Sequence, residues 1–243
     1  MNSPAWRVEH VEEIDSTNDA LAERARAGEP EGLALYAEHQ SRGRGRRGRT
    51  WEAPSGSSLL CSLLVRPALD VDSLQWAVAA VALSARAALG RYALDCDLKW
   101  PNDVLVEGEK IAGILAELVT TPTRAVVVGL GVNLTECPPD VGATDLAHHV
   151  VAPPTNRELL DAVLEEVGAR RELLDSTQGL ARLADEYRAA LATIGQRVVV
   201  HERETSWEGL AVGVDDAGHL LVRADGGLRV LAAGDVVHVR SAS

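Results

Sequence analysis

The sequence predicts an α+β fold in which strands and helices are interspersed over residues 1–193, followed by a small β-barrel. Three observations lead to this expectation. The chain has 243 residues, enough for one large domain and one small domain. Apolar residues make up 46% and charged residues 25%, as in ordinary globular proteins. After about Ile194 long helical patterns give way to short alternating segments.

The first part of the chain contains both strand and helix patterns. Alternating or short apolar runs predict strands over 6–14, 33–38, 58–65, 94–99, 104–107, 111–118 and 125–133. Longer amphipathic or Ala-rich runs predict helices over 20–27, 71–89, 156–174 and 179–191. The first helix follows an N-cap in the run from Asp15 to Asp19 and ends at Gly28, and the second ends at Gly90.

The last fifty residues contain only strand patterns. They predict strands over 196–202, 207–214, 219–224, 228–232 and 235–240. Residues 215–218 and 225–227 are typical hairpin turns. Five short strands are enough for a small barrel, so we place a domain boundary between residues 193 and 194.

Charge and composition restrict the partners and the compartment. The net charge of −12 disfavours nucleic acid and anionic membranes as partners of the whole surface. No segment approaches the roughly 18 uninterrupted apolar residues of a membrane span, and the N-terminus does not resemble a signal peptide. Cys61, Cys96 and Cys137 have no CxxC spacing, which argues against a disulfide scaffold and a structural zinc site. We therefore expect a cytoplasmic protein with no DNA or membrane partner.

Residues 39–57 form a long Gly- and Arg-rich loop containing five arginines between positions 42 and 49. Long loops in compact domains are usually functional. Glycines let backbone approach a ligand, arginines bind carboxylate and phosphate, and Trp51 offers a flat face to a base. Gly43, Gly45 and Gly48 also satisfy GxGxxG, but no helix starts there, which disfavours a dinucleotide site. A solvated basic loop and a nucleic-acid-binding arm remain as alternatives.

The two lysines of the chain, Lys99 and Lys110, lie eleven residues apart, whereas there are 22 arginines. This bias suggests that both positions need a compact point charge. Asn102 and Asp103 occupy the turn between them, and such a combination suits a polyphosphate with Mg²⁺. An ordinary hairpin with solvated charges is the alternative.

A third motif occurs in the predicted strand 125–133, which ends Gly129-Leu130-Gly131-Val132-Asn133. Its glycines suggest that backbone lies against a ligand, with Asn133 as a polar contact. A bulged strand is equally compatible with this pattern.

At these residues the sequence resembles the biotin protein ligases. The resemblance rests on the GRGRRGR-x-W loop, the KWPND run, the KIAGIL run and the GLGVN run, in this order, preceded by an STN element. It covers most of residues 10–135. It implies a mixed β-sheet flanked by helices, of the biotin/lipoate ligase type, and a C-terminal SH3-like β-barrel. About ten residues precede the similar region, so the chain resembles the short class without a DNA-binding domain.

The resemblance also implies a role for each motif residue. The expected biotin-binding residues are Ser16, Thr17, Asn18, Gln40, Arg44, Gly45, Arg46 and Lys99. The expected ATP-binding residues are Arg46, Arg49, Trp51, Asn102, Lys110, Asn133 and Arg240, with Asp103 near the metal. Lys99, Arg46 and Lys110 are the expected catalytic residues.

The implied reaction joins biotin to ATP as biotinyl-5′-AMP and then transfers biotin to a lysine of a biotin carboxyl carrier domain. Biotin and ATP are the implied substrates and Mg²⁺ the implied metal, and the chain is expected to be a monomer or a weak homodimer. A lipoate-type ligase and a non-catalytic ligand- or nucleic-acid-binding protein remain the rival interpretations.

Overall fold

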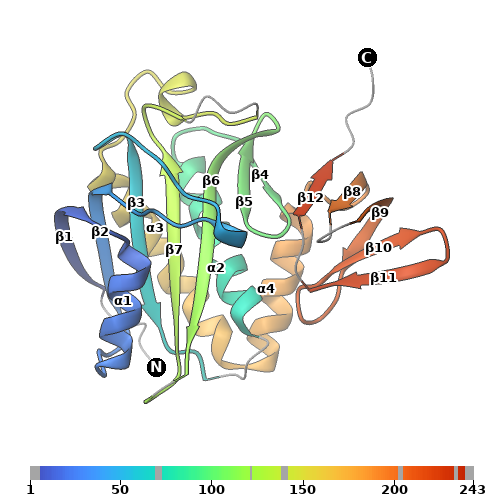
Figure 1. The fold of residues 1–243 in the computed structure, drawn as a ribbon, viewed down its shortest axis with the longest axis horizontal. Helices are drawn as coiled ribbons and strands as arrows, with labels where there is room; N and C mark the ends of the chain where they lie inside the picture. Colours follow the sequence, from blue (N-terminus) through green and yellow to red (C-terminus); the bar gives the residue numbers. More distant parts are fainter. Residues whose placement is uncertain are drawn as a thin grey trace.

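Two β-sheets organise the chain (Figure 1). The computed structural model describes residues 6–68, 73–120, 122–137, 142–201, 205–232 and 235–238. The main sheet contains β1 (Arg7–Ile14), β2 (Leu33–Gln40), β3 (Ser58–Val65), β4 (Cys96–Lys99), β5 (Asp103–Val106), β6 (Glu109–Val119) and β7 (Ala125–Asn133). The C-terminal sheet contains β8 (Arg197–His201), β9 (Ser206–Val214), β10 (Leu220–Ala224), β11 (Gly227–Leu231) and β12 (Asp235–His238).

The helices lie around the main sheet. They are α1 (Thr17–Arg26), α2 (Ser73–Gly90), α3 (Asn156–Arg171) and α4 (Thr177–Ala190). Three short 3₁₀ turns are η1 (Arg46–Gly48), η2 (Leu146–His148) and η3 (Glu172–Asp175). No helix in the described ranges is long and apolar enough to cross a membrane.

The main sheet is mixed, as expected. Its strand order is β1-β2-β3-β7-β6-β5-β4, in which β1 pairs with β2 in parallel. The remaining neighbours pair antiparallel. The predicted mixed sheet flanked by helices is therefore confirmed.

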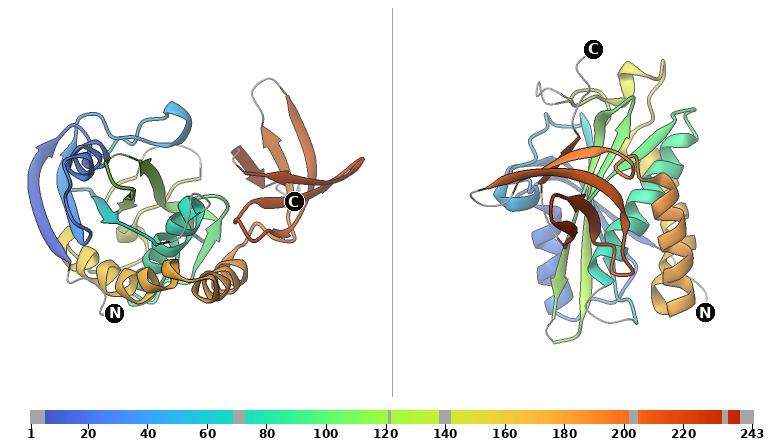
Figure 2. Two further views of the ribbon diagram at one scale, coloured as in Figure 1. Left: turned by 90° about the horizontal axis from the view of Figure 1, so that it is seen from below. Right: turned by 90° about the vertical axis from the view of Figure 1, so that its right-hand side faces the viewer.

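Alternation along the central strands gives this sheet two buried faces. Leu33 and Leu35 of β2 pack in a cluster with Leu21 of α1. Ala34 and Tyr36 belong to the larger cluster that contains α2, α3 and α4. Successive strand residues point to opposite faces, so α1 covers one face and the other helices cover the opposite one (Figure 2).

The C-terminal sheet is antiparallel, in the order β11-β10-β9-β8-β12. All five predicted strands are present. Pairing of β11 with β12, which would close a barrel, does not occur among the described residues, so the SH3-like barrel stays a prediction. The boundary between residues 193 and 194 also stays a prediction.

Two tryptophans attach the C-terminal sheet to the main domain. The indole N–H of Trp76 donates to the Asp216 carbonyl, and that of Trp100 donates to the Gly218 carbonyl, both at 3.0 Å. Thr193 Oγ1 accepts the Trp100 backbone N–H at 3.0 Å and lies 3.0 Å from His238 Nε2. These contacts bring His238 of the C-terminal sheet within reach of the charge of Lys99, at the end of β4.

Candidate active site

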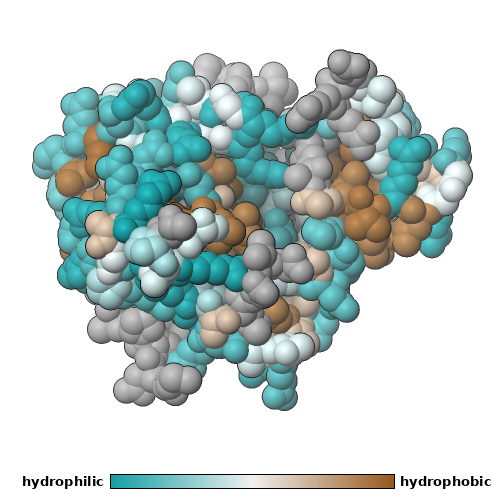
Figure 3. All heavy atoms as spheres, turned by 60° about the horizontal axis from the view of Figure 1, so that its bottom comes forward, coloured by the Kyte–Doolittle hydropathy of each residue, from teal (hydrophilic) through white to brown (hydrophobic). Residues whose placement is uncertain are grey.

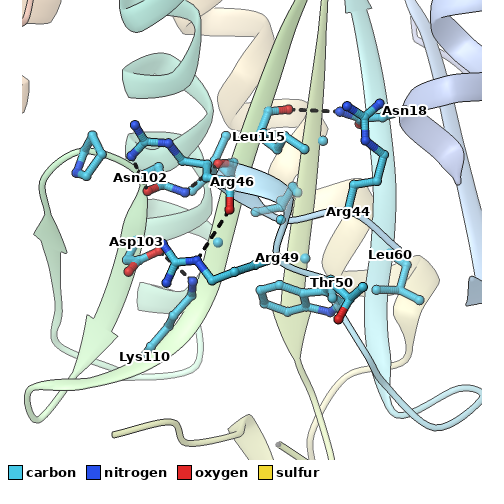
Figure 4. A pocket seen from close by; sticks show the side chains of 18 of the residues that line it. Asn18, Arg44, Arg46, Arg49, Thr50, Leu60, Asn102, Asp103, Lys110 and Leu115 are labelled. Atoms are coloured by element: carbon cyan, nitrogen blue, oxygen red, sulfur yellow. Dashed lines mark hydrogen bonds and ion pairs between the residues drawn. The ribbon is translucent and has the colours of Figure 1, made fainter. Parts of the chain in front are cut away.

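A pocket of about 290 Å³ lies on the face of the main sheet that α1 covers, next to the N-terminus of that helix (Figure 4). It brings together thirteen of the predicted site residues. They are Ser16, Thr17, Asn18, Gln40, Arg44, Gly45, Arg46, Arg49, Trp51, Lys99, Asn102, Asp103 and Lys110. In Figure 4 Asn18 and Arg44 lie at one end, and Asn102, Asp103 and Lys110 lie at the other.

The first end is a buried polar network at the start of α1. The Thr17 N–H and hydroxyl donate to Gln40 Oε1 at 2.7 and 3.0 Å. Asn18 Nδ2 donates to the Leu115 carbonyl and to Glu117 Oε1, both at 3.2 Å. Ser62 Oγ lies 2.7 Å from Thr17 Oγ1 and 2.5 Å from Asn18 Oδ1. Ser16 Oγ caps the helix by accepting the Asp19 N–H at 3.3 Å.

The Arg-rich loop forms the outer wall of the pocket. Its backbone turns back on itself through Gly45 N–H to the Arg49 carbonyl at 2.7 Å and Trp51 N–H to the Gly43 carbonyl at 3.0 Å. Two of its arginine side chains also contact residues outside the loop. Arg44 pairs with Asp19 and, at 2.8 Å, with Glu117, while Arg46 Nη1 donates to Asn102 Oδ1 at 3.1 Å.

The Trp51 ring packs against the backbone of two glycines. A Cβ on Gly131 would lie 2.7 Å from the Trp51 ring, and one on Gly113 would lie 2.9 Å from it. The two glycines are register partners on β6 and β7, so their missing side chains make one flat surface. The Trp51 indole nitrogen is buried and has no hydrogen-bond partner among the described residues, which leaves a donor for a ligand.

The second end holds Lys110, Asp103 and Asn102. Lys110 Nζ lies 2.7 Å from Asp103 Oδ1 and 5.4 Å from the centre of a Trp51 ring. Asn102 Nδ2 donates to the Ile114 carbonyl at 2.8 Å, which directs its oxygen toward Arg46. A cation, a carboxylate and an aromatic face therefore meet at adjacent strand ends.

Lys99 lies between the two ends, at the C-terminus of β4. It is partly buried, and its ammonium has no hydrogen-bond or ion-pair partner within the described parts of the chain. A partly desolvated positive charge without a protein partner favours an anionic ligand.

Comparisons with known proteins identify the family of the chain. Residues 11–133 match the model of the biotin/lipoate A/B protein ligase family, and residues 193–239 match that of the biotin protein ligase C-terminal domain. A biotin–[acetyl-CoA-carboxylase] ligase of Mycobacterium tuberculosis is 39% identical, over 97% of this chain and 90% of that protein.

The chain belongs to the biotin protein ligase family. A second ligase of the same description, from Paracoccus denitrificans, is 35% identical over 91% of this chain and 96% of its own length. The fold is similar to that of a biotin protein ligase from Aquifex aeolicus in complex with biotin and ATP. That structure has a TM-score of 0.82 and 28% identity, and the match covers 97% of this chain and 99% of the other.

Two of the residues expected in the ligase pocket are not among those that line it. Asn133 is buried on the same face of β7 as Gly131, beyond the lining residues, and its Nδ2 donates to the Thr144 carbonyl at 3.0 Å. Its role toward ATP stays a prediction. Arg240 lies outside the described residues.

Several lining or supporting residues were not foreseen. Ser62 and Glu117 complete the polar network, and His201, Val236 and Val237 of the C-terminal sheet line the pocket. Ser62 could have been noticed as a hydroxyl inside the apolar strand Ser58–Val65. The three C-terminal residues carry no local signal, because only the tertiary contact places them there.

The electrostatics of the pocket favour binding of anions over covalent catalysis. Cys61 also lines the pocket, but burial raises the pKa of its thiol to about 12, so it stays protonated and is a poor nucleophile. Desolvation opposes the charge of Arg44, but Asp19 and Glu117 outweigh it and raise the pKa of the guanidinium. Burial, and then the charge of Lys99, lower the pKa of His238.

Proposed function

We propose that this protein activates biotin with ATP as biotinyl-5′-AMP and transfers biotin to a lysine of a biotin carboxyl carrier domain. The observation that carries the proposal is the Lys99 ammonium, which has no partner among the residues that the structure describes and lies in one pocket with a buried polar end and a cationic aromatic end. The order of these parts matches the order of groups in a biotinyl adenylate: ureido ring, acyl phosphate, nucleoside.

The polar end supports biotin over lipoate. The ureido ring of biotin has two N–H donors and one carbonyl acceptor. Thr17, Asn18 and Ser62 offer buried hydroxyl and amide groups that can exchange partners with them. The dithiolane of lipoate has no such groups, and a polar pocket discriminates against a ligand that leaves its groups unsatisfied.

In the first step a carboxylate oxygen of biotin attacks the α-phosphorus of ATP. An O–P bond forms, the bond from phosphorus to the bridging oxygen breaks, and pyrophosphate leaves. Both reactants are anions, so the chain has mainly to position them and offset their charge. All four cationic side chains line the pocket, and we propose that Lys99 and Arg46 offset the charge of the carboxylate and the α-phosphate, and Lys110 and Arg49 that of the remaining phosphates.

Asp103 fits a Mg²⁺ that arrives with ATP. Magnesium in nucleotide sites is often held by one or two carboxylates, with the phosphates and water supplying the other ligands. Asp103 is a pocket carboxylate already beside a cation, Lys110, at 2.7 Å. No group of three candidate metal ligands occurs in the described parts of the chain, which disfavours a metal site made by protein alone. The bound metal would offset phosphate charge.

The proposed partner is a carboxylase carrier domain, and the remaining proposals are that the protein acts as a monomer or weak homodimer and does not bind DNA.

Exchange of labelled pyrophosphate into ATP tests the proposal. We expect exchange that depends on biotin and is absent with lipoate. Exchange with lipoate would favour the lipoate-ligase alternative. Biotin or ATP binding without any exchange would favour a non-catalytic binder.

A further inference from the structure

One wall of the pocket comes from the C-terminal sheet. His201, at the end of β8, and Val236 and Val237, on β12, line the same pocket as Lys99 and Asn102. Val236 is buried, whereas Val237 is 47% exposed. Val236 and Val237 are neighbours on one strand, so their side chains point to opposite faces of the sheet, and that of Val236 belongs to the core. The pairing of β8 with β12 puts His201 on the same face as Val237. This face of the wall therefore carries an exposed valine and a histidine. Figure 3 shows that other apolar residues also gather over this sheet.

The His201 ring is held by one of its two nitrogens. Nδ1 lies 2.8 Å from the hydroxyl of Ser206, its register partner on β9. The His201 carbonyl accepts from Arg47 Nη1 at 3.4 Å, so the end of β8 meets the Arg-rich loop at this point. Nε2 has no partner among the described residues. When Nδ1–H donates to Ser206, Nε2 carries a free lone pair.

The transfer step of the proposed function needs a group of this kind. A lysine ammonium ordinarily has a pKa near 10.4, so it must lose a proton before its nitrogen can attack. Its four-carbon stem is apolar and packs well against aliphatic side chains. The acceptor lysine also has to come from solvent, since it belongs to another protein.

We propose that this wall is the entry channel for the acceptor lysine, with Val237 against its stem and His201 Nε2 as the acceptor of its proton. The inference rests on the proposed function and adds the path of the second substrate.

The proton and bond changes balance as follows. His201 Nε2 takes one proton from the lysine ammonium. The uncharged nitrogen attacks the biotinyl carbonyl carbon, so a C–N bond forms and the C–O bond to AMP breaks. The electron pair of that bond leaves with AMP, and the second N–H proton of the adduct goes to its phosphate. His201 then returns its proton to solvent.

The other nearby groups are less suitable proton acceptors. His238 Nε2 is engaged with Thr193 Oγ1 at 3.0 Å, and His238 is not among the lining residues. Asp103 is paired with Lys110 at 2.7 Å.

The first test compares two nucleophiles on the full-length His201→Gln variant. Preformed enzyme-bound biotinyl-5′-AMP is mixed with an acetyl-CoA carboxylase carrier domain or with hydroxylamine, whose nitrogen is already uncharged near neutral pH. We expect transfer to the carrier to fall about 10²-fold, the lower range for a general base. Transfer to hydroxylamine and pyrophosphate exchange should stay within about twofold of wild type.

The matched control is His10→Gln, a histidine on β1 that contacts Glu38 and Tyr36 outside the pocket. It should leave both transfers unchanged. Equal loss with the two nucleophiles would mean that His201 only supports the structure. Unchanged carrier transfer, or a loss of pyrophosphate exchange, would also overturn the assignment. Failure of the wild type to adenylate biotin would overturn the proposed function itself.

The second test places a charge in the channel. With preformed enzyme-bound biotinyl-5′-AMP, so that ATP binding does not enter the measurement, Val237→Lys should raise KM for the carrier domain at least tenfold, because a second ammonium repels the incoming one. Val230→Lys is the matched control, since Val230 is 56% exposed on β11 and does not line the pocket. Equal KM values for the two variants would show that the lysine enters elsewhere.

Discussion

Lys99 shows how much one side chain can contribute when the fold holds it without a partner. Its ammonium lies at the end of β4 between the two ends of the pocket, and within the described residues no carboxylate offsets it. The fold therefore keeps a charge available for an anion that arrives later. Such preorganised charge is effective in catalysis because little rearrangement is needed in the transition state.

We expect Lys99→Ala to slow biotinyl-5′-AMP formation by about 10²–10³-fold, the usual effect of losing one preorganised contact. The melting temperature should change little, since the ammonium makes no described contact that the fold needs. Single-turnover adenylation and calorimetry measure the two quantities. Near-wild-type adenylation by a folded Lys99→Ala protein would falsify the role of Lys99, and Lys99→Arg should not rescue it, because the guanidinium places its charge differently.

Sequence patterns at the residue scale pointed to thirteen residues that line one pocket, whose roles stay predictions, and missed residues that only a long-range contact brings there. The loop and the Lys99–Lys110 segment each carry several unusual residues in one stretch, so their chemistry is visible locally. His201 and Val237 are ordinary strand residues, and only docking of the C-terminal sheet brings them to the pocket. Asn133 Nδ2 donates to the Thr144 carbonyl, and the predicted contact of Asn133 with ATP stays a prediction.

Among the elements, the Arg-rich loop is held by contacts that are individually weak. Arg42 pairs with Asp15, and Arg44 pairs with Asp19 and Glu117, all partly or fully exposed. Exposed ion pairs contribute about 0–1 kcal/mol each, so they do not lock the loop. An anionic ligand would add stronger contacts, because it meets several arginines at once.

We therefore expect trypsin to cleave within residues 42–49 more slowly when biotin and Mg-ATP are present. The measurement is the rate of appearance of the corresponding fragments by mass spectrometry. Cleavage at arginines outside the loop is the internal control and should not change. If ligands leave the loop cleavage rate unaltered, the loop does not close over them.

Element bounds follow from local pattern, whereas strand order does not. The strands at 58–65 and 125–133 have the predicted bounds, because each is a largely apolar run with turn residues on either side. That β3 pairs with β7, and β1 runs parallel to β2, depends on contacts between distant segments. The 3₁₀ turn Leu146–His148 was not predicted, since a single turn has no periodicity.

At the scale of the whole molecule, the C-terminal sheet is part of the site rather than an appendage. Its buried residues Val198, Leu220 and Val236 belong to the same apolar cluster as Trp76 and Trp100. The Asp215–His219 turn supplies the two carbonyls that the tryptophan indoles bond. These bonds therefore help to set how the C-terminal sheet, with His201 and Val237, lies against the main domain.

An added side chain at this turn tests whether docking of the C-terminal sheet affects transfer of biotin without affecting its binding. Gly218 has a φ of +79°, and a Cβ there would lie 2.7 Å from Gln75 Cγ on α2. Gly226, in another turn of the same sheet, has a φ of +100° and nothing within 4 Å of its Cβ position. Both alanine variants bear the cost of a left-handed residue, about 1–2 kcal/mol. Only Gly218→Ala also brings a Cβ too close to Gln75, so either this side chain or the turn has to shift.

We expect Gly218→Ala to slow carrier biotinylation at least tenfold relative to Gly226→Ala, with biotin affinity the same in both variants. The proposed biotin contacts at Thr17, Asn18 and Gln40 lie in the main domain, and none of these residues belongs to the C-terminal sheet. Isothermal calorimetry gives the affinity, and labelled-biotin transfer gives the rate. Equal transfer rates would show that the wall formed by the C-terminal sheet tolerates displacement. A loss of biotin affinity in Gly218→Ala alone would instead place the biotin site against that sheet.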